Sequence, residues 1–211
     1  MLEGIHWLGH ASFRIDGAQV IYIDPWKLKQ PKPADLILVT HAHFDHLSPE
    51  DIAKISQPGT VVVCPASCAD AVSGDVRVIA PGESLRVGDV LVEAVPSYNV
   101  DKPNHPKAAG NVGYIVEVVG DVAQPRGQRI YHAGDTDLIP EMSQVRCDVA
   151  LLPVGGTYTM NAEEAAQAVA RIKPKAVVPM HWGDVVGSKR DVERFKRGVP
   201  EGVEVVVPRA E

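Results

Sequence analysis

Hydrophobic positions along this chain fall mostly in short runs rich in valine and isoleucine, separated by glycine, proline and aspartate. Runs of this length and composition, bounded by turn residues, predict β-strands. The run "ADLILVT" is apolar at consecutive positions, as in a strand that is buried on both faces. We expect strands at 4–9, 11–16, 19–24, 34–40, 60–64, 76–80, 90–95, 112–119, 128–133, 148–154, 176–180 and 203–207.

Helix signals occur in a few segments between these runs. Ser48 is a suitable N-cap, and Pro49 follows it at the first helical position. Asn161 is a second suitable cap, with Glu164 three residues later. We expect helices at 46–55, 161–172 and 188–198. Strands in meander order in the first half, followed by strand–helix alternation, predict helices on both faces of a layered β core.

The composition is that of an ordinary globular protein, with 211 residues, 45% hydrophobic residues and a net charge of −6. Because no run of basic residues occurs, neither nucleic acid nor a membrane is an expected partner. No secretion signal and no apolar stretch of about 18–20 residues is visible. Three cysteines without a C-x-x-C motif suit free, buried thiols in a reducing compartment, so we expect a cytoplasmic protein. The sequence carries no signal for an oligomeric state.

The segment "HAHFDH" at 41–46 follows the expected buried strand directly. In open α/β sheets, ligands bind at the carboxyl ends of strands. His41 and His43 are two positions apart, so in an extended or turning segment both rings can reach one ion. Asp45 and His46 come at the turn into the helix and would serve a second ion nearby. The segment therefore predicts a metal site.

The pattern H-x-H-x-D-H after an apolar strand resembles the metallo-β-lactamase superfamily. "YHAGDTD" is similar to the family segment whose aspartate bridges two metals, and "VVPMHWGD" is similar to the segment with its late histidine ligand. The resemblance implies that Asp135 is the bridging ligand, that His181 binds the second ion, and that His105 is the remaining histidine ligand.

The same resemblance implies an α+β fold, the four-layer αββα sandwich, in a single domain over 1–211 with two halves of about 1–110 and 111–211. Stretches such as "WLGHASFRI" and "YIDPW" are most similar to the small group that includes ascorbate-6-phosphate lactonase.

The resemblance further implies a metal-dependent hydrolase with two divalent ions. The implied ligands are His41, His43 and His105 for the first ion, and Asp45, His46 and His181 for the second, with Asp135 shared. Zinc is the expected metal, and manganese or iron would also suit histidine and aspartate ligands. Metal-bound hydroxide would attack an ester, lactone or phosphodiester in a small molecule, and Asp45 would relay the proton. A local positive site would allow that small molecule to be anionic.

Two other functions stay open: a di-iron redox enzyme or dioxygenase of the same superfamily, and a non-catalytic sensor that binds metal or ligand. Specificity is expected to reside in the loops at 25–33, 97–111 and 155–161. In the last of these, glycines follow a buried strand, so either their N–H groups approach a ligand or they form a turn before a capped helix.

Several further residues have both a functional and a structural interpretation. His10 is a second catalytic candidate that would contact substrate or a bridging ligand, unless it is simply satisfied at a strand edge. His132 competes for the third ligand position, but alternation along its strand favours a place behind the ligands or in the core. Asp24 would orient a metal-binding histidine or cap a turn. Trp26 would form a pocket wall or pack ordinarily, and His6 is expected to be structural.

Overall fold

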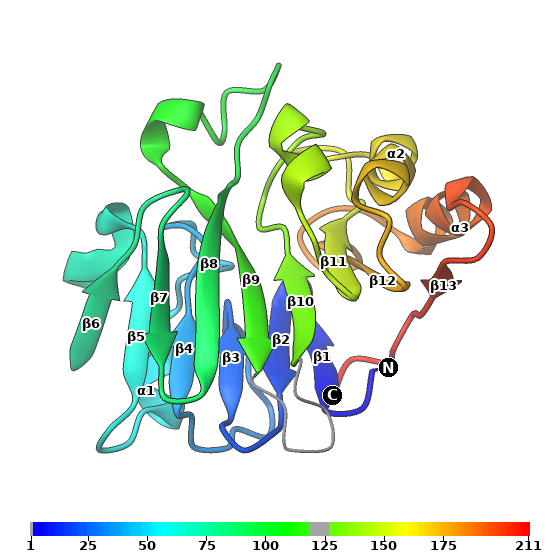
Figure 1. Ribbon diagram of the computed structural model, residues 1–211. Coiled ribbons are helices and arrows are strands. Elements are labelled where there is room, and N and C mark those ends of the chain that lie inside the picture. The colour runs from blue at the N-terminus through cyan, green and yellow to red at the C-terminus, as the bar shows by residue number, and fades with distance from the viewer. Residues whose placement is uncertain (1, 119–126) are drawn as a thin grey trace.

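The computed structural model describes residues 2–118 and 127–211, and its strands form two mixed sheets (Figure 1). The first sheet has the order β1 (Ile5–Gly9), β2 (Ser12–Ile15), β3 (Ile21–Ile23), β4 (Leu36–Leu38), β5 (Val61–Cys64), β6 (Asp75–Val78). The second has the order β13 (Glu204–Val205), β12 (Ala176–Met180), β11 (Val149–Pro153), β10 (Gln128–His132), β9 (Val112–Val118), β8 (Val90–Pro96), β7 (Ser84–Val87). The helices are α1 (Pro49–Ile55), α2 (Ala162–Ile172) and α3 (Lys189–Gly198), with short 3₁₀ helices η1 (Ala66–Ala71), η2 (Lys107–Ala109) and η3 (Pro140–Gln144).

Alternation along β4 shows how the first sheet is buried on both faces. Leu36 and Leu38 pack into the large hydrophobic cluster between the sheets, while Ile37 packs into a second cluster that includes Ile52 and Ile55 of α1. Successive side chains of a strand point to opposite faces, so a continuous apolar run is what a doubly covered strand requires. The expectation from "ADLILVT" is confirmed.

The layers are α1 with η1, the first sheet, the second sheet, and α2 with α3, which lie beside β11 and β12 in Figure 1. The predicted start of α2 is confirmed: the Asn161 side chain accepts from the backbone N–H of Glu164, and the Glu164 carboxylate accepts from the backbone N–H of Asn161. The architecture confirms the expected α+β sandwich. Within the described ranges, no helix is long and apolar enough to cross a membrane.

The chain passes between the sheets ahead of the β7–β8 hairpin. It leaves the first sheet after Val78 and enters the second at Ser84, and the division into halves near residue 110 stays a prediction. The strand β7 was not predicted, because its apolar content is low. The strand expected at 203–207 is reduced to Glu204–Val205, and the last residue of the strand expected at 112–119 lies outside the described residues.

Strand direction brings the loops of interest to one edge of each sheet. β1 and β3 are both antiparallel to β2 and therefore run alike, and β4 is parallel to β3. In the second sheet, β8 and β10 are both antiparallel to β9, and β11 and β12 are parallel to β10. Every predicted metal ligand lies in a loop that follows the carboxyl end of β4, β8, β10 or β12.

Tyr114 links the two sheets, and its removal tests this packing. Its hydroxyl on β9 donates to the carbonyl oxygen of Val39 at 2.7 Å and lies 3.3 Å from that of Val63. We expect Tyr114→Phe to lower the free energy of unfolding by about 1–2 kcal/mol, because a buried carbonyl loses a donor. Equilibrium urea unfolding measures this change.

Tyr131→Phe is the matched control. The Tyr131 hydroxyl is also buried, but among the described residues it has no hydrogen-bond partner. Its removal should leave the stability unchanged or raise it. Equal losses in the two variants would contradict the assigned role of Tyr114.

Candidate metal centre

The first set of ligand candidates surrounds His43. Nε2 of His41 and Nε2 of His105 each lie 3.1 Å from Nδ1 of His43. His41 and His43 follow β4 in the first sheet, whereas His105 lies in the long loop after β8 in the second. The set therefore joins loops from both sheets, and its potential ligand atoms all lie within 4.8 Å of one another.

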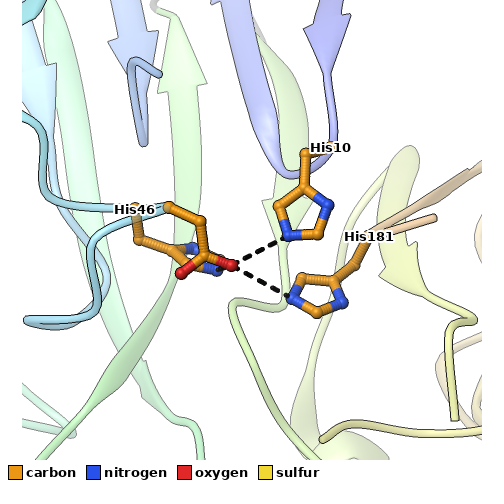
Figure 2. Close-up of side chains that lie close together, drawn as sticks. His10, His46 and His181 are labelled. Atoms are coloured by element: carbon orange, nitrogen blue, oxygen red, sulfur yellow. Dashed lines mark hydrogen bonds and ion pairs between the residues drawn. The ribbon is translucent and has the colours of Figure 1, made fainter. Parts of the chain in front are cut away.

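The second set contains His10, Asp45, His46 and His181, all buried. Nε2 of His10 donates to Oδ2 of Asp45 at 3.0 Å, since an ionised carboxylate can only accept. Nε2 of His46 and Nε2 of His181 lie 3.8 and 4.0 Å from the same oxygen. Figure 2 shows the three rings, which come from three separate segments, turned toward a common point.

Asp135 lies between the two sets. Its Oδ2 is 3.0 Å from Nε2 of His181 and 3.4 Å from Nε2 of His105. Its Oδ1 is 3.3 Å from Nε2 of His46. One buried carboxylate thus faces nitrogens of both sets, which is the geometry that a shared ligand needs.

A buried hydrogen-bond network behind the cluster fixes the orientation of two rings. Asp24 accepts from Nδ1 of His46 at 2.7 Å, and from the backbone N–H and the hydroxyl of Thr40 at 2.8 and 2.7 Å. The Thr40 oxygen, having donated its own hydrogen, accepts from Nδ1 of His41 at 2.9 Å. Nε2 of both His41 and His46 is therefore the atom left for a proton or a cation. Of the two interpretations of Asp24, the structure favours the orienting one.

Asn99 holds His105 in the same way. Its Oδ1 accepts from the backbone N–H of His105 at 2.9 Å and from ring Nδ1 at 3.0 Å, while its backbone N–H donates to the His105 carbonyl at 2.7 Å. Its Nδ2 donates to the carbonyl of Tyr158 at 2.8 Å, which anchors the clamp to the loop before α2. Because Nδ1 is engaged in this hydrogen bond, Nε2 is the atom of His105 that faces the other members of the first set.

The donor set fits divalent cations. Nε2 of His46, Nε2 of His181 and Oδ1 of Asp135 are buried and, within the described part of the chain, make no hydrogen bond of good geometry, although the two nitrogens lie 3.3 and 3.0 Å from the Asp135 carboxylate. Such atoms cost about 1–3 kcal/mol each, so native proteins seldom keep several together without a ligand. Nitrogens in a tetrahedral zinc site lie about 3.3 Å apart when the bonds are about 2.0–2.1 Å long. The 3.1 Å separations around His43 are close to that value.

Strained backbone occurs at two members of the second set and at Asp24 behind them. His10, Asp24 and His181 have φ of 50°, 47° and 57°, a left-handed region that costs side-chain-bearing residues about 1–3 kcal/mol each. The carbonyl of His10 accepts from the backbone N–H of His181 and from the indole of Trp7, both at 2.9 Å. A Cβ at Gly155 would lie 2.5 Å from the His181 carbonyl oxygen, so a glycine is needed there.

The charges of the cluster follow from burial and mutual contact. Burial, together with the neighbouring His46, holds the pKa of His41 well below its usual value. Burial lowers the pKa of His46, but Asp135 and Asp24 outweigh it and raise that pKa well above its usual value. Burial raises the pKa of Asp135, but His181 and His46 outweigh it and hold that pKa well below its usual range. The carboxylate of Asp135 is therefore ionised at neutral pH.

The structure brings together all of the residues that the sequence analysis assigned as ligands: His41, His43, Asp45, His46, His105, Asp135 and His181. His10 joins them as a neighbour of Asp45. His132 does not, because its Nε2 donates to the Ala11 carbonyl and its Nδ1 accepts from Gly134. This is the position behind the ligands that we expected.

The structure also bears on the interpretation of residues outside the ligand sets. His6 lies outside the centre, between Asp16 and Glu211, as expected for a structural residue. The backbone N–H of Gly156 donates to Met160 in the turn before α2, which favours the turn interpretation. Sequence reasoning missed Asn99 and Thr40. Thr40 could have been found from the sequence, because it directly precedes "HAHFDH". Nothing in the sequence indicates that Asn99 contacts His105.

Comparison with known proteins agrees with this geometry. The family model described as "Beta-lactamase superfamily domain" matches residues 4–181. The chain is 38% identical to a UPF0173 metal-dependent hydrolase of Pyrococcus horikoshii, over 96% of this chain and 95% of the relative.

Solved structures give the same result. A Parabacteroides distasonis protein assigned to the metal-dependent hydrolases superimposes with a TM-score of 0.84 at 30% identity, over 98% of this chain and 93% of that one. Igni18, a metallo hydrolase of Ignicoccus hospitalis, shares the fold with a TM-score of 0.77 at 24% identity, over 98% and 94% of the two chains. The chain belongs to the metallo-β-lactamase superfamily and, within it, to the UPF0173 family of metal-dependent hydrolases. The narrower resemblance to ascorbate-6-phosphate lactonase stays a prediction.

Replacing Asn99 tests the clamp on His105. Asn99→Leu removes the acceptor that orients the ring, so we expect affinity for zinc to fall about 10–100-fold. Competition with a chromophoric chelator measures this affinity, and circular dichroism checks the fold. Asn104→Leu, at an exposed position next to His105, is the matched control and should bind zinc like the parent protein. Unchanged affinity in Asn99→Leu would contradict the clamp.

Proposed function

We propose that this protein is a dinuclear hydrolase that cleaves an ester, lactone or phosphodiester bond in a small molecule. The observation that carries the proposal is the position of Asp135, whose two oxygens face nitrogens of both ligand sets. A single-ion site would need one set, whereas here two sets share a buried carboxylate. Paired ions that share a ligand are a recurrent device of hydrolytic metalloenzymes.

The residues divide between two ions as follows. The first would be held by His41, His43 and His105, the second by Asp45, His46 and His181, and both by Asp135. Zinc is the metal that this histidine-rich donor set suits best, and manganese or iron is also compatible with it. Of the ligand candidates His43 is the exposed one, so substrate would approach from its side.

Two divalent ions held there would lower the pKa of a coordinated water from 15.7 to about 7 and polarise the carbonyl or phosphoryl oxygen. The chain itself orients the reactants and handles the proton. Burial raises the pKa of Asp45, but the hydrogen bond from His10 and the nearby His46 outweigh it and lower that pKa. Oδ2 of Asp45 is therefore ionised and can accept a proton.

The proposed reaction balances without a further co-reactant. In ester cleavage, the water oxygen bonds to the acyl carbon, and the bond from that carbon to the leaving oxygen breaks. Oδ2 of Asp45 takes one proton from the water and delivers it to the leaving oxygen, while His10 holds this carboxylate in place through their 3.0 Å hydrogen bond. The products are a carboxylic acid and an alcohol.

Asp135→Asn tests the shared ligand. The amide keeps the shape of the side chain but lacks the charge, so we expect bound metal to fall from two ions per chain to one or fewer. Hydrolysis should fall with it, by about 100-fold. Elemental analysis measures the metal, and a p-nitrophenyl ester, a lactone and bis(p-nitrophenyl) phosphate measure turnover with zinc or manganese.

Asp101→Asn is the control, because that side chain is 79% exposed in the loop that carries His105. It should keep the metal content and turnover of the parent protein. Full metal content with unchanged turnover in Asp135→Asn would reject the bridging role. Oxygen uptake by iron-loaded protein that hydrolyses nothing would support the redox alternative, and bound metal with neither activity would support a sensor.

A further inference from the structure

Two aromatic side chains near the metal centre, Trp26 and Phe44, belong to neither of the two hydrophobic clusters of the described residues. Trp26 is half-buried, whereas the other two tryptophans pack in or against the large cluster between the sheets. Phe44 is 68% exposed, whereas the other two phenylalanines are fully buried. Neither ring therefore belongs to the hydrophobic core of the described residues.

Phe44 is held beside the ligand candidates by its place in the chain, and Trp26 by its ring contacts. Phe44 lies between His43 and Asp45, so its position is tied to theirs. Its ring centroid is 5.9 Å from that of Trp26 in an edge-to-face contact. The Trp26 ring is in turn 5.4 Å from the ring of His10, again edge to face. We call Trp26 and Phe44 the aromatic shelf; it extends outward from His10 to the exposed ring of Phe44.

A lysine lies over the aromatic shelf but is weakly held. Nζ of Lys27 is 4.0 Å from the Trp26 ring centroid and 3.1 Å from both carboxylate oxygens of Asp184. These side chains are 58% and 46% exposed, and exposed ion pairs contribute about 0–1 kcal/mol. A ligand that contacts the ring displaces this lysine at small cost.

An exposed phenylalanine next to a reaction centre has a specific chemical use. When an apolar group covers a ring that was exposed to water, the free energy of binding becomes more favourable by about 25 cal/mol per Å² of apolar surface removed from solvent. Ligand sites commonly combine a few polar groups that fix orientation with apolar walls that supply affinity. The metal centre supplies the polar part, and the aromatic shelf is an apolar wall next to it.

We propose that the aromatic shelf binds an apolar alkyl or aryl group attached to the scissile bond, so that the substrates are apolar esters or lactones rather than small polar ones. This inference rests on the proposed function, because it assigns the shelf to the substrate of the same centre.

Carboxylates of increasing chain length test the inference, since they have the chemistry of an ester product. Isothermal titration of the zinc-loaded protein with acetate, butyrate and hexanoate gives their dissociation constants. We expect hexanoate to bind about 10-fold more tightly than acetate, because a half-covered methylene contributes roughly a twofold gain. Equal affinities, or no binding of hexanoate, would overturn the inference even if zinc binding and ester hydrolysis are intact.

Variants then locate the effect. In Phe44→Ala and in Trp26→Ala the preference for hexanoate over acetate should shrink to twofold or less, and Phe44→Leu should restore part of it. Val78→Ser removes an apolar side chain that is 53% exposed on β6, and it should keep the preference of the parent protein. A preference that survives in both alanine variants would place the apolar group elsewhere. Failure of the proposed function would instead appear as absent zinc or absent hydrolysis in the parent protein.

Discussion

The buried carboxylate of Asp24 is the interaction on which the metal centre depends. A charge removed from water is tolerated only when hydrogen bonds satisfy it, and Asp24 receives three, from the backbone and hydroxyl of Thr40 and from the ring of His46. These bonds exist because β3 and β4 are parallel neighbours, so the residues after their carboxyl ends meet. The pairing of these two strands therefore determines how the two rings are oriented. Asp24 fixes the ring of His46 directly and the ring of His41 through Thr40.

Much of this could be predicted from the sequence, because it depends on local patterns. The apolar runs locate most strands, and the capped helix after 161 is where its signals place it. The spacing within "HAHFDH" indicates a metal site by itself, whereas the parts of His105, Asp135 and His181 came from the family resemblance. The structure brings these three side chains together with that segment, and their roles as metal ligands stay predictions.

The remainder depends on contacts between distant segments. β7 has too few apolar residues to be recognised alone and is defined by pairing with β8. The passage between the sheets, from β6 to β7, is likewise a matter of pairing. Asn99 orients His105 across a loop, and its own side chain is held by the carbonyl of Tyr158, which is far away in the sequence. No periodicity reports such contacts.

The centre also shows where this protein accepts unfavourable local structure. Left-handed backbone at His10, Asp24 and His181 and an exposed Phe44 gather at the same edge, together with buried ring nitrogens that, among the described residues, make no hydrogen bond of good geometry. Left-handed backbone and buried polar atoms without a well-formed hydrogen bond both cost folding free energy. Their concentration at one place is expected when a cation and a substrate complete the contacts that the chain leaves open.

Anomalous diffraction at the zinc edge, from crystals grown with zinc, tests the central claim most directly. The account predicts two peaks: one within about 2.0–2.2 Å of His41, His43 and His105, the other within that distance of Asp45, His46 and His181, with a carboxylate oxygen of Asp135 in reach of each. No peak among these side chains, or a single peak that Asp135 does not contact, would contradict it.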